Sequence, residues 1–302
     1  MNFKKLLNPF YILSGILHRF GTHFISNDIL YIKLDYFFNM HSKLNLNNPQ
    51  SFNEKLQWLK IYNKKEYFTQ LVDKATVKDF IKEIIGEEYI IPTYGVWNNF
   101  ENIPFENLPN KFILKCTHDS GGIVICKNKN DFNKEQAKIK INHCLQKNYY
   151  LEHREYPYKN VVPRIIAEKL LETADIDGVK DYKFMCFHGV CKMVFVCSNR
   201  SKQNVNIDFF DTQWNHLPFK RHYQNSPYPI KKPKNLEKMI SIVEKIANKI
   251  ETPFIRIDLY EILNKIYFGE VTFFPGAGLE EFDPKEWDYK IGRWINLSVL
   301  NK

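Results

Sequence analysis

Two carboxylates lie within an otherwise apolar stretch near the end of the 302-residue chain. Residues 256–276, RIDLYEILNKIYFGEVTFFPG, have the pattern of a β-hairpin whose strands carry Asp258 and Glu270. A three-residue loop would set Asp258 opposite Glu270 and Arg256 opposite Thr272, with all four side chains on one face. Like charges directly opposed across a ladder are unfavourable by up to ~1 kcal/mol, so the hairpin predicts a group that offsets this repulsion.

A divalent cation is one group that would offset it. Oxygen ligands such as those of Asp258, Glu270 and Thr272 suit Mg²⁺ better than zinc, with phosphate and water in the remaining positions. The alternative is a solvated face on which Arg256 balances one of the acids. This register places the loop at residues 263–265, and the opposite face is expected to point into the core through Ile255, Ile257, Leu259, Tyr267, Val271 and Phe273.

A second group of residues is typical of phosphate binding. Lys115 is the only charge in an apolar strand, and the loop after it contains Ser120, Gly121 and Gly122. Glycines let backbone N–H groups approach an anion closely, so a strand lysine and this loop together form a plausible phosphate clamp. The Asp-Ser-Gly-Gly segment is equally consistent with a plain turn.

A third group lies at the ends of later strands. Glu168 ends an apolar run, Asp181 and Lys183 open the next, and Arg200 ends the strand after that. An acid in this place could bind a ribose hydroxyl, and Lys183 and Arg200 could face phosphate. Each of these residues taken singly is also an ordinary strand-end charge.

The elements that must position these residues are read from periodicity and capping signals. Ser51 and Glu54 form the capping-box pattern of one helix, and Gly86 ends another. Later β-branched and aromatic runs predict strands, with helices near 131–148 and 235–250. The expected fold class is α+β, with a helical N-terminal region, a small α+β unit and a larger α+β unit at residues 1–90, 91–165 and 166–302.

Charge and cysteine content narrow the class of protein. The net charge of +9 favours an anionic partner, but no run of five or more basic residues occurs, which argues against nucleic acid. The six cysteines contain no C-x-x-C pair and no spacing of a structural zinc site. We therefore expect reduced thiols and a cytoplasmic protein.

The first twenty residues combine apolar side chains near helical spacing with Lys4, Lys5 and Arg19. Asn8 and Pro9 interrupt the apolar stretch and no small-residue cleavage site follows, which argues against a signal peptide. No segment has the ~20 apolar residues of a membrane span. The remaining alternatives are a helix packed on the core and a helix lying on a membrane surface, the second of which would place the protein at the inner face of the membrane.

Taken in order, the strand lysine with its glycine loop, the strand ending in an acid, the D-Y-K strand and the R-x-D/G-E-x-T hairpin resemble the ATP-grasp superfamily. More narrowly, the chain is similar to the TupA-like ATP-grasp group found with teichuronopeptide and capsular polysaccharide biosynthesis. The resemblance covers about residues 45–298. It is carried by FNEKLQWLKIY, DKATVKDFI, PFENLPNKFILKCTHDSGG, DYKFMCFHG and YFGEVTFFPGAG.

The resemblance implies two α+β lobes that clasp ATP, and it assigns roles to individual residues. Asp258 and Glu270 match the magnesium-binding acids, and Arg256 matches the arginine that stabilises the transferred phosphoryl group. Thr272 departs from the superfamily pattern, which usually has Asn as a further metal ligand there. Lys183 is expected to hold phosphate beside Arg256. The residues implied to bind ATP are Lys115, the lid residues His118, Ser120, Gly121 and Gly122, then Glu168, Lys169 and Leu170 around adenine and ribose, with Asp181 and Arg200.

The activity implied by the resemblance is ligation. ATP phosphorylates a carboxylate to an acyl phosphate, and an amine then attacks it to give an amide, ADP and phosphate. The carboxylate would be a uronic acid of a cell-surface polysaccharide, and the amine an amino acid or amino alcohol. Three alternatives remain: a kinase on the same fold that phosphorylates a sugar hydroxyl, a sugar-nucleotide glycosyltransferase, and a non-catalytic binding protein, against which the paired acids argue.

Overall fold

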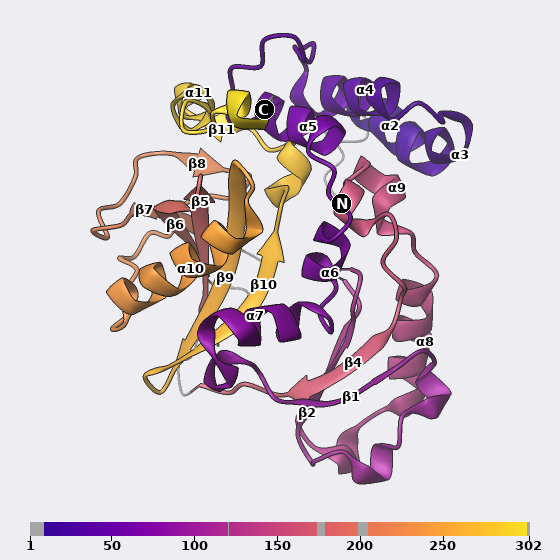
Figure 1. The fold of residues 1–302 in the computed structure, drawn as a ribbon. Helices are drawn as coiled ribbons and strands as arrows, with labels where there is room; N and C mark the ends of the chain where they lie inside the picture. Colours follow the sequence, from indigo (N-terminus) through magenta and orange to yellow (C-terminus); the bar gives the residue numbers. More distant parts are fainter. Residues whose placement is uncertain (1–8, 120, 174–178, 199–204, 301–302) are drawn as a thin grey trace.

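The computed structural model describes residues 9–119, 121–173, 179–198 and 205–300, and it confirms the α+β class. Helices precede two antiparallel sheets that lie side by side, with strand β10 of the larger sheet on the side nearest the smaller one (Figure 1). The helices are α2 (Pro9–Ile16), α3 (Thr22–Phe24), α4 (Asp28–Met40), α5 (Phe52–Tyr62), α6 (Phe68–Val72), α7 (Val77–Ile85), α8 (Lys134–Leu145), α9 (Tyr149–His153), α10 (Leu236–Ile250) and α11 (Glu286–Gly292). The π-helical turn Leu17–Gly21 joins α2 to α3.

The capping interactions predicted for the helical region are present in the structure. The Ser51 side chain accepts the Glu54 N–H, and the Glu54 carboxylate accepts the Ser51 N–H in return. Gly86 ends α7 with a φ of 103°. Helices α5 to α7 bury their apolar residues in the same core as the large sheet, among them Phe52, Leu56, Phe68, Val77 and Ile81.

The small sheet has the strand order β1-β4-β2-β3. Its strands are β1 (Thr93–Trp97), β2 (Phe112–Cys116), β3 (Ile123–Cys126) and β4 (Ile165–Lys169). Helix α8 packs on β2 and β3, and Ile141 buries itself against Phe112 and Leu114. Because residues alternate between the two faces of a strand, Ile113 and Lys115 point to the other face. Since β4 belongs wholly to this sheet, we propose that the lobes divide after Lys169, not at the expected boundary between residues 165 and 166.

The large sheet has the order β10-β9-β5-β6-β7. Its strands are β5 (Asp181–Phe187), β6 (Val190–Ser198), β7 (Asn206–Asp211), β9 (Phe254–Ile262) and β10 (Lys265–Thr272), and β8 (Lys220–Arg221) pairs separately with β11 (Phe282–Asp283). Helix α10 packs on β5, β6 and β9 through seven buried residues of one face, which is the amphipathic pattern predicted for 235–250.

The hairpin β9–β10 has the predicted register where the charges lie, but for a different reason. Glu270 pairs with Asp258 and Thr272 with Arg256. The predicted three-residue loop is wrong: Leu263 and Asn264 form a two-residue turn with φ values of 50° and 65°, as a type I′ hairpin requires. The shorter loop changes the register by one residue.

A β-bulge restores the register. The pairing shifts between Phe268 and Glu270, so Gly269 is the additional residue. Before the bulge, Tyr267 pairs with Tyr260, and Phe268, which is buried, pairs with Leu259. Tyr267 therefore does not point into the core as expected, and Phe268 takes that place.

The N-terminal helices only partly match a helix packed on the core. Leu17 is buried, whereas Leu13 and Phe20 are exposed. Across the described residues, the helices fall short of the length and apolar character needed to cross a bilayer. The first eight residues, including Lys4 and Lys5, lie outside the described part of the chain.

Candidate active site

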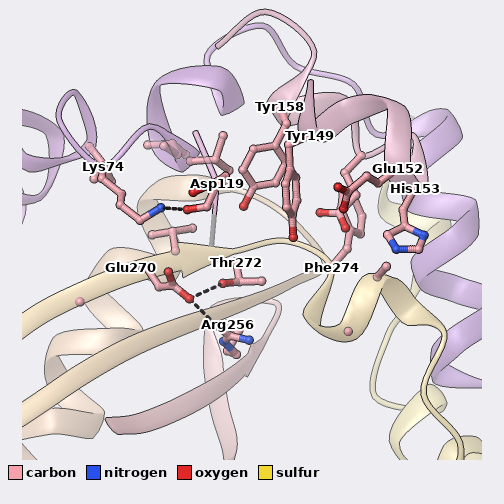
Figure 2. Close-up of a pocket in the computed structure, with 18 residues that line it drawn as sticks. Lys74, Asp119, Tyr149, Glu152, His153, Tyr158, Arg256, Glu270, Thr272 and Phe274 are labelled. Carbon is pink, nitrogen blue, oxygen red and sulfur yellow. Dashed lines mark hydrogen bonds and ion pairs between the residues drawn. The ribbon is translucent and has the colours of Figure 1, made fainter. Parts of the chain in front are cut away.

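Two cavities meet at the hairpin and share Lys74, Gly269 and Glu270. The sheet cavity, of 460 Å³, lies between the small sheet and the hairpin. The helix cavity, of 350 Å³, lies beneath α9 and the short helix Tyr156–Tyr158, and Arg256 and Thr272 line it together with Glu270 (Figure 2). Glu270 therefore borders both spaces.

The four hairpin side chains on one face form a hydrogen-bonded network. Arg256 donates from Nε to Asp258 Oδ1 at 2.7 Å and from Nη2 to Asp258 Oδ2 at 2.8 Å. The same Nη2 donates to Glu270 Oε1 at 2.6 Å, and Thr272 Oγ1 lies 3.4 Å from that oxygen. The guanidinium joins both acids and offsets much of their repulsion directly. The alternative of a solvated face is wrong at Asp258, which is 1% exposed.

The two acids differ in environment. Burial raises the pKa of Asp258 to about 6, against the opposing effects of Arg256 and Lys183. Burial also raises the pKa of Glu270, but the effects of Arg256 and then Lys183 outweigh burial and lower this pKa to about 2. Both groups are therefore ionised at neutral pH. The Glu270 side chain is 41% exposed, so a ligand can reach it.

Lys183 lies at the inner end of the sheet cavity between two acids. Its Nζ contacts Asp258 and lies 2.6 Å from Asp181 Oδ2. Burial lowers the pKa of Lys183, but Asp181 and Asp258 outweigh this effect and raise it above the ordinary lysine value. The structure thus brings Lys183 and Asp181 to the cavity as an ion pair, and the expected binding of ATP by Asp181 stays a prediction.

The opposite wall of the sheet cavity comes from the small sheet. Lys115 Nζ lies 2.7 Å from Glu168 Oε2, and Lys78 of α7 contacts the other carboxylate oxygen. Lys169 and Leu170 continue this wall, as expected. The apolar lining consists of Ile90, Ile91, Ile113, Ile125, Val179 and Phe268, among others. A slot with apolar walls and a few charged groups is suited to a flat base carrying a charged tail.

The glycine loop is built differently from the expectation. The His118 ring is buried and lines neither cavity; its Nε2 lies 3.2 Å from the Cys144 carbonyl and 3.1 Å from that of Lys147. Gly121 and Gly122 also lie outside both linings. A Cβ at Gly122 would lie 2.6 Å from Cys116 Sγ, so glycine is needed there for packing against the loop's own strand.

Two further predicted residues, Ser120 and Arg200, lie outside the described part of the chain. The glycine loop instead contributes Asp119, which lines the helix cavity and accepts the Gly122 N–H at 2.8 Å.

Sequence reasoning missed two lysines and one wall of the site. Lys74 lines both cavities, and its Nζ donates to the Asp119 carbonyl (Figure 2). Burial lowers the pKa of Lys74, and Glu270 opposes this shift. Lys74 and Lys78 lie four residues apart in DKATVKDFI. In a helix this spacing would place both side chains on one side, and it is the signal by which the sequence could have indicated these two lysines. The missed wall consists of Tyr149, Glu152, His153, Glu155 and Tyr158.

The donor set fits a magnesium ion. Mg²⁺ takes oxygen ligands and is usually held by one or two carboxylates together with substrate phosphates. Glu270 supplies an ionised, accessible carboxylate between the cavities. Asp258 lies directly across the ladder but lines neither cavity, and Arg256 and Lys183 hold its carboxylate, so it could reach a metal only if these contacts rearranged. Thr272 lies within reach of the Glu270 carboxylate. We propose these three residues as the magnesium site.

Comparisons with known proteins place the chain in a family. The model of the family described as TupA-like ATPgrasp matches residues 54–296, close to the extent expected from the sequence. No curated protein matches the chain. Among solved structures, D-alanine-D-alanine ligase from Helicobacter pylori is 16% identical, with a TM-score of 0.43 over 81% of this chain and 68% of that one.

Two further structures are similar at the same level. L-amino acid ligase from Bacillus licheniformis is 12% identical, with a TM-score of 0.46 over 84% of this chain and 57% of that one. D-alanine-D-alanine ligase from Bacillus anthracis in complex with ATP is 13% identical, with a TM-score of 0.42 over 76% and 66%. The family match spans most of the sequence, so the chain belongs to the TupA-like ATP-grasp family.

Proposed function

We propose that the protein uses ATP and Mg²⁺ to join a carboxylate to an amine through an acyl phosphate. Membership of the ATP-grasp family makes it an ATP-dependent ligase. The observation that carries the proposal is Glu270, an ionised carboxylate that borders two cavities, one suited to a nucleotide and one lined by polar and aromatic side chains. The phosphoryl group to be transferred would lie where the cavities meet.

The sheet cavity is proposed to hold ATP. The base would lie among the isoleucines and Phe268, near Glu168, Lys169 and Leu170. Lys115 and Lys183 would then face the phosphates, and the nucleotide would take over part of their present pairing with Glu168 and Asp181. A bound Mg²⁺ would neutralise developing charge on the phosphates, held by Glu270 and Asp258 with Thr272 beside them.

The helix cavity is proposed to hold the acceptor. A substrate carboxylate would be drawn towards Arg256 and Lys74, which line this cavity together with Glu270. Its oxygen attacks the terminal phosphorus and ADP leaves; the amine then attacks the acyl carbon and phosphate leaves. Arg256, held by Asp258 and Glu270, would stabilise charge on the transferred group.

We propose a uronic acid of a capsular or other cell-surface polysaccharide as the carboxylate, and an amino acid or amino alcohol as the amine. Two observations support a sugar in the helix cavity. Tyr149 and Tyr158 lie with ring centroids 4.7 Å apart at an interplanar angle of 54°, and such rings offer an apolar face with a polar edge. The net charge of +9 agrees with an anionic glycan.

The N-terminal helices support a location in the cytoplasm at the inner face of the membrane. All six cysteines are buried and none forms a disulfide, which agrees with a reducing compartment. Tyr11, Ile12, Ile16 and Phe20 are each 46–53% exposed beside Arg19, as in helices that lie on anionic membranes. We expect the protein to sediment with phosphatidylglycerol vesicles and not with phosphatidylcholine vesicles. If it sediments with neither kind of vesicle, this location is contradicted.

A substrate screen tests the proposed function. The protein is incubated with MgATP, a panel of uronic acids and sugar nucleotides that carry them, and a panel of amines, and products are identified by mass spectrometry. We expect phosphate release that depends on the amine, together with a product whose mass is the sum of both substrates less one water. A stable phosphorylated sugar formed without amine would show a kinase instead.

A further inference from the structure

A buried carboxylate lies in the wall of the helix cavity, away from the hairpin. Glu155 is 4% exposed and lines the cavity beside the end of α9. The chain turns at Arg154, whose φ of 54° is left-handed. The Arg154 side chain fixes this turn by donating to the carbonyls of Thr22 and Ile25, both at 3.1 Å. Glu155 is therefore held in place by its backbone.

Within the described residues, the Glu155 carboxylate has no hydrogen bond and no ion pair within 4 Å. Lys60 is the cation with the largest effect on it, and Lys60 Nζ donates its one hydrogen bond within the described residues to the Ala277 carbonyl at 2.7 Å. Burial raises the pKa of Glu155, and Lys60 and His153 oppose the shift. Buried charges are normally paired, so an unpaired carboxylate facing a cavity indicates a ligand of opposite charge.

Tyr158 lines the same cavity as Glu155 and Glu270. Burial is the main cause of the raised pKa of the Tyr158 hydroxyl, and Glu155 and Glu270 raise it further while Arg256 lowers it. The hydroxyl is thus within electrostatic range of Glu155 and of the hairpin network. The cavity has the cations Arg256 and Lys74 beside Glu270, and its α9 wall carries the carboxylates of Glu152 and Glu155. This polarity matches a carboxylate at one end and an ammonium group at the other.

We infer that Glu155 binds the ammonium group of the amine co-substrate and takes the proton that the nitrogen must lose before it attacks. This inference rests on the ligase function proposed above. One proton passes from the ammonium group to Glu155, and the nitrogen lone pair forms the bond to the acyl carbon. The bond from that carbon to the phosphate oxygen breaks with its electron pair, and the departing phosphate takes the second proton from nitrogen. Glu155 returns its proton to solvent after the product leaves.

The experiment separates the two half-reactions, with D-glucuronate as the carboxylate probe and ethanolamine as the amine probe. Acyl phosphate is trapped with hydroxylamine as the hydroxamate; hydroxylamine is uncharged at neutral pH and needs no base. In Glu155→Gln we expect hydroxamate formation within about twofold of wild type, and amide formation lowered about 100-fold or more, with a raised KM for ethanolamine. Glu172→Gln, which removes an exposed acid paired with Lys111 outside both cavities, is the matched control and should behave as wild type.

The outcomes distinguish this inference from the proposed function. If Glu155→Gln makes amide at the wild-type rate, or if it loses hydroxamate and amide formation together while its melting temperature is not lowered, the inference is wrong and the ligase function stands. If wild type makes neither hydroxamate nor amide with any carboxylate in the screen, the proposed function itself fails. The amide rate of wild type should fall as the pH is lowered and Glu155 becomes protonated; the same fall in the glutamine variant would also contradict the inference.

Discussion

Arg256 determines how the two acids of the hairpin coexist. Its guanidinium contacts both Asp258 and Glu270, and Lys183 contacts Asp258 from the neighbouring strand β5. The sequence predicted these residues on one face and predicted a cation between them. It could not reveal that the protein's own cations already fill part of that role, because Lys183 reaches Asp258 only through the pairing of β5 with β9.

Replacing Glu270 by glutamine tests the accessible member of the network. Because the amide keeps the shape but loses the charge that would hold Mg²⁺, we expect Mg²⁺-dependent turnover to fall by about 100-fold or more with the fold intact. Steady-state phosphate release and the melting temperature are the measurements. Glu87→Gln, on the surface beside Lys82, is the control. Near-normal activity in the Glu270 variant would refute the metal assignment.

Glu155 also makes a prediction about stability. Because burial raises its pKa, the folded protein binds a proton there that the unfolded chain releases more readily, so the buried charge becomes more unfavourable as the pH rises. We expect Glu155→Gln to increase the free energy of unfolding by about 1 kcal/mol at pH 8 and by less at pH 5. Urea denaturation at both pH values measures this. A variant less stable at pH 8 would indicate a partner for the carboxylate.

At the scale of elements, the hairpin shows how a correct prediction can rest on a wrong step. The sequence called for a three-residue loop, whereas the structure has a two-residue turn and a bulge at Gly269, and the two differences cancel at Asp258 and Glu270. The bulge also explains the exchange of Tyr267 for Phe268 in the core. Helices with caps and strands with regular alternation were predictable because local residues determine them.

The turn offers a test at this scale. Leu263 is 89% exposed and has a left-handed φ of 50°, which is unfavourable for a leucine by about 1 kcal/mol. We expect Leu263→Gly to raise the free energy of unfolding by about 0.5 kcal/mol with unchanged activity, after the greater entropy of glycine in the unfolded chain is deducted. The matched change Asn264→Ala should lower it, since alanine tolerates this φ less well. The opposite order in thermal melts would contradict the turn geometry.

The cavity wall formed by α9 and the residues after it could not be predicted from local sequence patterns. Tyr149, Glu152, His153 and Tyr158 belong to short helices without a long apolar period, and Glu155 lies between these helices. They line a cavity with hairpin residues that lie far away in the sequence. Each residue type is ordinary at its position. Their common role becomes visible only when the fold places them around one cavity.

At the scale of the whole molecule, the site exists because two sheets face each other across it. The small sheet supplies Lys115 and Glu168, and the large sheet supplies Lys183 and Glu270, with Asp258 buried behind them. A nucleotide bound between them would contact both, so binding should stabilise the whole chain. The family resemblance predicted this arrangement, while the contributions of Lys74 and of the glycine loop through Asp119 required the structure.

A non-hydrolysable ATP analogue tests the arrangement. With Mg²⁺ and a ligand concentration of 100 times Kd, we expect about 2.7 kcal/mol of added stability, seen as a raised melting temperature. Lys115→Ala should reduce this shift and raise the KM for ATP, because it removes a cation facing the phosphates. Lys111→Ala, four residues away on the surface, is the control. Stabilisation by a uridine nucleotide but not by the ATP analogue would favour a glycosyltransferase.

The central claim is that an acyl phosphate forms where the two cavities meet. Its most direct test uses D-glucuronate, or the uronate identified by the screen, labelled with ¹⁸O in the carboxyl group, together with ATP, Mg²⁺ and the amine. A ligase of this kind must transfer one ¹⁸O atom from each carboxylate to the released phosphate, which mass spectrometry detects. Release of phosphate without the label, with both ¹⁸O atoms retained in the sugar product, would contradict the account.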